Sequence, residues 1–217
     1  MFGNTKNAIW EAFLLTVVIF IFGLLVGAAY EMSNFDKMNE YYTTSENSLM
    51  DILALNNLID SENSTCNVLI TSNLDFADRI YKEAKILENY ESSGKISENM
   101  KLIHTKYDIL RTFLWISNNK VFEKCPKEFS SVVYLYEYNS QDLAQKATQN
   151  VWSKILFDLK QEKGEKIILI PIAVDTNIIS LETLIKKFNI SNYPVVIINN
   201  KKIITKLESV DELKKEL

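Results

Sequence analysis

An uncharged apolar run near the N-terminus, Ala12 to Ala29, constrains this chain more than any other segment. It holds 18 residues, and with its flanking residues it reaches about the 20 residues that span a hydrocarbon core of roughly 30 Å. Trp10 and Tyr30 fall at its two ends, where amphipathic aromatic side chains favour the membrane interface. The sequence therefore predicts a transmembrane anchor within residues 1–30.

The charges on the two sides of this run predict its orientation. Lys6 and the amino terminus precede it, whereas mostly acidic side chains follow it. Because cations near a span favour the cytoplasmic side, we expect the N-terminus in the cytosol and everything after Tyr30 outside, in a single-pass protein of the cell membrane. The alternative is a signal peptide cleaved beside the small residues at Gly27 to Ala29.

Two cysteines, Cys66 and Cys125, lie in the part expected outside. An even pair without CxxC spacing is typical of a structural disulfide in an oxidising compartment. Closing a loop of about 60 residues would stabilise the fold by about 4 kcal/mol on the chain-entropy model. Two unrelated buried thiols are the alternative.

The charge balance argues against several kinds of partner. The net charge is −4 and no segment is strongly basic, so a nucleic-acid partner is not expected. The single histidine, His104, is interpreted as an ordinary helix residue, because nothing pairs with it at ligand spacing. The sequence predicts no metal site and no cofactor.

Residues 31–125 are predicted to be helical. The pattern from Glu31 to about Asp60 continues the membrane helix outward as a stalk. Two apolar stripes follow, from Phe76 to Leu87 and from Ile96 to Leu114, and the polar segment Glu91 to Lys95 separates them. Such a loop predicts an antiparallel helical hairpin, in which the stripes pack on each other. A coiled coil that makes a homodimer through these helices is the alternative.

Residues 130–217 are predicted to form a second kind of domain, with the element order β-α-β-α-β-β-α. The expected strands are Ser130 to Tyr138, Lys166 to Asp175, Val195 to Ile198 and Ile203 to Leu207, and the expected helices are Ser140 to Lys163, Leu181 to Phe188 and Val210 to Leu217. A right-handed crossover makes the first two strands parallel, and a hairpin makes the last two antiparallel, which gives a four-stranded mixed sheet. Pro171 places the second strand at the edge.

This order, with Tyr193-Pro194 opening the third strand in "YPVVIINNKK", resembles the thioredoxin-like fold family over residues 130–217. The expected fold class is therefore α/β: an N-terminal transmembrane helix and a helical hairpin, then a thioredoxin-like domain. The resemblance implies that the Tyr193–Pro194 bond is cis and faces a redox dithiol. At the dithiol's position this chain has Ser140-Gln141-Asp142-Leu143 instead of CxxC.

The missing dithiol decides what chemistry to expect. Thiol–disulfide exchange needs a thiolate and a resolving sulfur, so no catalytic residue is predicted. Ser140 is interpreted as a helix N-cap, with a glutathione-type site as the alternative. The resemblance also implies a groove for an extended polypeptide, bordered by Tyr138, Ser140, Tyr193 and Pro194. A purely structural domain is the competing interpretation.

The leading functional hypothesis is a membrane-anchored, extracytoplasmic binding, scaffolding or chaperone-like module that is not an enzyme. Its partner would be a polypeptide client or another membrane protein. A thiol–disulfide oxidoreductase that uses Cys66 and Cys125 is the first alternative. A structural membrane protein that dimerises through its helices is the second.

Overall fold

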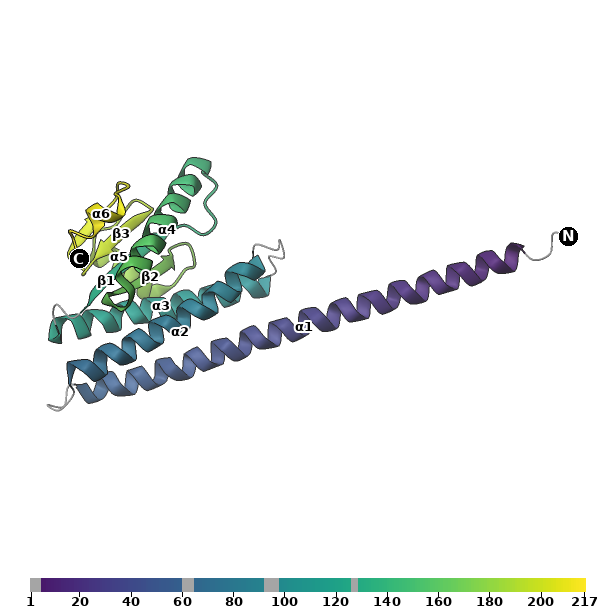
Figure 1. Cartoon of the computed structure of the whole chain (residues 1–217), viewed down its shortest axis with the longest axis horizontal. Coiled ribbons are helices and arrows are strands. Elements are labelled where there is room, and N and C mark those ends of the chain that lie inside the picture. Colours follow the sequence, from purple (N-terminus) through teal and green to yellow (C-terminus); the bar gives the residue numbers. More distant parts are fainter. Residues whose placement is uncertain (1–4, 60–64, 92–97, 126–128) are drawn as a thin grey trace. The chain divides into compact units, whose positions relative to one another are not determined.

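The structure, a computed structural model, describes residues 5–59, 65–91, 98–125 and 129–217. The chain forms two compact units, Met1–Tyr41 and Tyr42–Leu217. Figure 1 labels most of their helices and strands. We describe each unit by itself.

The first unit consists of the N-terminal part of one long helix, α1 (Thr5–Ile59). The segment Ile9–Ser33, 25 residues long, is apolar enough to cross a membrane by length and composition, and none of its side chains is buried. An apolar helix was predicted here. The helix continues without a break through the predicted stalk.

Besides the C-terminal part of α1, the second unit contains two helices before its sheet, α2 (Cys66–Glu91) and α3 (Glu98–Lys124), which pack on each other. The hydroxyl of Ser117 donates a hydrogen bond to Oδ1 of Asn73 at 2.9 Å across this contact. Among the stripe residues whose side chains the structure describes, the buried ones are Phe76, Ile80, Ile103, Tyr107, Leu110 and Leu114. Most of the predicted hairpin loop, Ser92 to Lys95, lies outside the described residues.

A four-stranded mixed sheet forms the centre of the second unit, as predicted. Its strands are β1 (Ser130–Tyr136), β2 (Ile167–Ala173), β3 (Val195–Ile198) and β4 (Lys202–Ile204), in the spatial order β2-β1-β3-β4. β1 is parallel to β2 and antiparallel to β3, and β3 is antiparallel to β4. Pro171 lies on the edge strand β2, where no neighbour needs its missing N–H.

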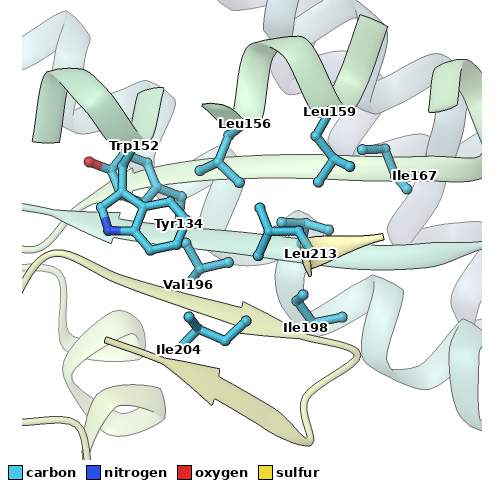
Figure 2. Close-up of a cluster of buried hydrophobic side chains, with 10 residues drawn as sticks. Tyr134, Trp152, Leu156, Leu159, Ile167, Val196, Ile198, Ile204 and Leu213 are labelled. Carbon is cyan, nitrogen blue, oxygen red and sulfur yellow. The ribbon is translucent and has the colours of Figure 1, made fainter. Parts of the chain in front are cut away.

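Helices α4 (Leu143–Lys163) and α6 (Val210–Leu213) cover one face of the sheet. A 3₁₀ turn, Gly164–Lys166, follows α4. Figure 2 shows side chains of α4 facing those of the strands across this layer. The buried core there comprises Val132, Tyr134, Trp152, Leu156, Leu159, Ile167, Val196, Ile198, Ile204 and Leu213. Side chains alternate along a strand, so Val133 and Leu135 of β1 are buried on the opposite face.

That opposite face is covered by the helices before the sheet. α3 contacts β1 and β2, α2 contacts β2, and α5 (Ile179–Lys187) contacts α3. Trp115 of α3, which is buried, stacks on Phe188 with ring centroids 5.4 Å apart. Its Nε1–H donates a hydrogen bond to Oδ1 of Asn200 at 2.6 Å. The two helices α2 and α3, called the helical pair below, therefore share one packed interior with the sheet.

The turn after β3 depends on two asparagines. Asn199 and Asn200 have φ of 51° and 54°, in the left-handed region that asparagine tolerates better than most residues. The Asn200 amide also donates a hydrogen bond to Oδ1 of Asn119 at 2.8 Å. At the other end of β3, the Tyr193–Pro194 peptide bond is cis.

We expect Asn200→Ala to destabilise the second unit by about 2 kcal/mol, measured by urea unfolding of the full chain in detergent. The change leaves the buried Nε1–H of Trp115 without its acceptor and puts alanine at a left-handed φ. Asn200→Gly separates the two causes, because glycine accepts this φ without strain and loses only the hydrogen bonds. Wild-type stability in both variants would show that this contact does not hold α3 to the sheet.

Candidate functional site

The first turn of α4 occupies the position that the resemblance assigns to a dithiol. Ser140 is buried there; its hydroxyl donates to Oε1 of Gln145 at 2.6 Å and accepts from the Asp142 N–H at 3.3 Å. The prediction that Ser140 caps the helix is wrong. The N-cap is Asp142, whose carboxylate accepts hydrogen bonds from the N–H groups of Ala144 and Gln145. A carboxylate at this position also complements the helix dipole.

A second aspartate, Asp175, explains why the helix begins later than predicted. Its carboxylate oxygens accept hydrogen bonds from the N–H groups of Tyr138 and Asn139, each at 2.8 Å. These bonds hold the residues after β1 in a loop, so the helix cannot begin at Ser140. Because Asp175 follows β2 and lies 36 or 37 residues away in sequence, the local pattern did not reveal it.

The amide of Gln145 joins the start of α4 to the start of β3. Its Nε2 donates a hydrogen bond to the carbonyl oxygen of Tyr193 at 3.2 Å, while its Oε1 accepts from Ser140. Pro194 is buried next to this contact. Burial raises the pKa of Tyr193, and the charge of Glu137 raises it further. The structure thus brings together three of the four predicted groove residues, Ser140, Tyr193 and Pro194.

The fourth predicted groove residue, Tyr138, packs on a helix instead. Its ring lies against the imidazole of His104, with centroids 4.1 Å apart and planes inclined by 35°. Tyr138 therefore connects the loop after β1 with α3. His104 is only 6% exposed, so its interpretation as an ordinary helix residue overlooked a buried polar contact.

His104 belongs to a buried ionic cluster centred on Asp108. Asp108 is fully buried. Its Oδ1 accepts hydrogen bonds from Nη1 of Arg111 at 3.2 Å and from the Ala173 N–H at 3.3 Å. Its Oδ2 lies 2.9 Å from Nδ1 of His104. The cluster ties α3 to the last residue of β2.

The contact between His104 and Asp108 is close and buried. Nδ1 of His104 and Oδ2 of Asp108 lie 2.9 Å apart, and neither atom makes a hydrogen bond among the described residues.

A cleft of about 650 Å³ opens beside this cluster. Its lining comes from the edge strand β2, from α4, from the helical pair and from the end of β1, in particular Leu169, Pro171, Lys146, Gln149, Asn150, Ser153, Leu156, Phe157, Lys160, Tyr81, Ala84, Lys85, His104, Arg111, Tyr134, Tyr136, Glu137 and Tyr138. This volume is in the range of small-molecule sites. Unlike a typical apolar pocket, the cleft has several cations and tyrosines in its wall.

Two ionisable groups of the cleft are shifted by burial. Burial lowers the pKa of Lys160, although the charges of Asp78 and Glu165 oppose this. The ammonium of Lys160 donates hydrogen bonds to the carbonyls of Gly164 and Ile167, at 3.0 and 2.9 Å. Burial also raises the pKa of Tyr134, whose hydroxyl donates to the Gln149 carbonyl at 3.1 Å. Both groups therefore lie in a partly desolvated environment.

Some of these residues left a signal in the sequence. His104 and Asp108 are four residues apart on the predicted helix, and this spacing puts two side chains on one face. The role of Gln145 left no such signal, because its partner Tyr193 lies 48 residues later. The cleft also left none, because its walls come from distant segments.

The predicted disulfide between Cys66 and Cys125 is present. It joins the first residue of α2 to the residue after α3 and so fastens the start of one helix to the end of the other. Among the residues that the structure describes, no group of three or more His, Cys, Asp or Glu side chains could hold a metal ion.

Comparisons of the chain with protein-family models, with curated proteins and with solved structures found no match.

Proposed function

We propose that this chain is a membrane-anchored, extracytoplasmic binding protein that is not an enzyme. Its residues 130–217 would form a thioredoxin-like domain without a redox dithiol. The strand order β2-β1-β3-β4, with β1 and β2 joined through α4, supports this domain. The observation that carries the function is the hydrogen-bonded series Ser140–Gln145–Tyr193, which contains no sulfur and lies where the resemblance would put a dithiol.

The position of the two cysteines supports a non-catalytic role. Both are held in the disulfide that closes the helical pair. Cys125 lies before β1 in the sequence, and Ser140 lies after it. The seven residues of this strand span about 20 Å, so they separate the disulfide from the start of α4. The oxidoreductase alternative needs the sulfurs of Cys66 and Cys125 near Pro194, so this separation counts against it.

The apolar segment of α1 and the disulfide support the proposed location. A helix of this length and composition suits a membrane anchor. A disulfide is typical of a segment that folds in an oxidising compartment. Together they favour the expected orientation, with the N-terminus in the cytosol and the second unit outside.

The proposed ligand is an extended polypeptide segment, supplied by a client or by another membrane protein. A strand that pairs with the backbone at Tyr193 would use its carbonyl group. In this structure that carbonyl accepts a hydrogen bond from the Gln145 side chain. A bound strand would replace this bond, so Gln145 keeps the groove closed until a ligand arrives.

The test is photo-crosslinking of the full chain in lipid nanodiscs, with a benzoylphenylalanine in place of Tyr193. The probe is reduced, carboxymethylated α-lactalbumin, which stays unfolded, and native α-lactalbumin is its folded control. We expect adducts with the unfolded form, and none from a photo-reactive residue at Lys206, which is exposed. Absence of adducts at position 193 would refute polypeptide binding there.

Substitution of Gln145 sharpens the test. Gln145→Ala frees the Tyr193 carbonyl, so the unfolded probe should bind about threefold to tenfold more tightly in a fluorescence-anisotropy titration. Gln141→Ala is the matched control, since its side chain donates to the nearby Asn139 carbonyl and not to Tyr193. Equal affinities in the two variants would show that Gln145 does not occupy the binding groove.

A further inference from the structure

The cleft beside the Asp108 cluster has a charge opposite to that of the chain. Its lining includes four lysine and arginine side chains, Lys85, Arg111, Lys146 and Lys160, and one acid, Glu137. Three acids outside the lining offset part of this charge: buried Asp108 behind Arg111, and Asp78 and Glu165, whose charges act on Lys160. The lining itself still carries more cations than acids, in a chain of net charge −4. A positive cleft with low-dielectric walls concentrates anions.

Aromatic rings form much of the remaining wall. Tyr134 and Tyr136 are stacked with centroids 5.4 Å apart, and Tyr138 lies on His104. Tyr81 and Phe157 line the cleft from α2 and α4. Tyr134 is buried, whereas the other four rings are at least partly exposed and offer flat apolar faces to a ligand ring. The cleft therefore suits a ligand that combines a flat ring with a negative charge.

The strand at the base of the cleft argues for a small ligand and against a polypeptide. β2 is an edge strand, and an open edge can pair with an added strand. Pro171 lines the cleft in the middle of this edge and has no N–H to donate. It interrupts the ladder that an added strand needs, although it leaves an apolar surface for a ring.

We propose that this cleft binds a small aromatic carboxylate, whose ring packs among the tyrosines and whose carboxylate is held by Lys85 and Lys146. The partial burial of Lys160 supports this assignment, because an anion nearby would offset the desolvation that lowers the lysine's pKa. This site is separate from the polypeptide groove at Tyr193, so either proposal can fail without the other.

The probe for this site is 4-benzoylbenzoate, a photo-reactive aromatic carboxylate, used with the full chain in lipid nanodiscs. Irradiation followed by peptide mass spectrometry should place adducts on the cleft segments of α2 and α4, around residues 81–85 and 146–157. Neutral benzophenone, which lacks the carboxylate, should give much weaker labelling there. Adducts concentrated in Ile9–Ser33, or equal labelling by both compounds, would overturn the proposal.

Matched lysine variants test the charge. Lys85→Gln with Lys146→Gln should weaken saturable labelling by about fivefold, since each exposed ion pair contributes little by itself. Lys82→Gln with Lys154→Gln removes the same charge from exposed positions on the same two helices outside the cleft lining and should leave labelling within twofold. An equal loss in both pairs would show a general effect of net charge and overturn the site.

Competition identifies the chemical class. An excess of 2-naphthoate should displace the probe, while laurate, which has a carboxylate on a flexible chain, should not. Displacement by laurate alone would refute the aromatic ligand and show that the cleft takes a lipid-derived acid.

Discussion

Asp108→Asn is expected to lower the midpoint of thermal unfolding of the second unit by about 10 °C. Removing one partner from a buried ionic cluster costs about 3–5 kcal/mol, because the remaining charge stays buried without compensation. A change of 1 kcal/mol shifts the midpoint by about 2–4 °C in a unit of this size. The measurement is circular dichroism of the full chain in detergent during heating.

The size of this effect follows from the position of Asp108. It is fully buried and has three partners, the side chains of His104 and Arg111 and the N–H of Ala173. Asparagine has nearly the same volume and can still accept from Ala173, so the variant removes the charge while it leaves the packing intact. The loss should therefore loosen the junction between α3 and β2.

Asp158→Asn is the matched control, because Asp158 is exposed on α4 and the same atoms change. Its midpoint should stay within about 2 °C of the wild type, since surface substitutions rarely exceed about 0.5 kcal/mol. Similar midpoints for Asp108→Asn and Asp158→Asn would mean that the cluster contributes no net stability.

The sheet could be predicted from the sequence because its strands are short apolar runs with clear ends. The segment Val195–Ile198 was predicted with the bounds that the structure has, since Pro194 precedes it and two asparagines follow it. The predicted ends of other strands were less accurate: β1 was expected to reach Tyr138 but ends at Tyr136. There, hydrogen bonds to the distant Asp175 determine the local conformation.

The candidate sites were less predictable, because each depends on contacts between distant segments. Ser140 and Asp142 are both good N-cap residues, and local preference does not choose between them. The bond from the Ala173 N–H to Asp108 joins residues 65 positions apart, so the four-residue spacing of His104 and Asp108 could suggest a pair but not its burial. The cleft exists only once β2, α4 and the helical pair are packed.

Replacing both Cys66 and Cys125 by serine is expected to lower the midpoint of thermal unfolding by about 10 °C. The two sulfurs close a loop across 59 residues, and the chain-entropy model assigns about 4 kcal/mol to such a loop. The effect should be large here because the bond joins the first residue of α2 to the residue after α3, shortly before β1 in the sequence. Calorimetry of the full chain in detergent measures it.

The reduced wild-type protein is the control, because dithiothreitol should bring its midpoint to that of the serine variant and leave the variant unchanged. A thiol count on protein trapped at lysis and then denatured tests the compartment as well. We expect no free thiol before reduction and two afterwards. Two free thiols from the start would mean that the disulfide does not form in the cell, and the second unit would then have to be placed in the cytosol, with the orientation of α1 reversed. An unchanged midpoint without the sulfurs would instead show that packing of α2 on α3 alone holds the helical pair.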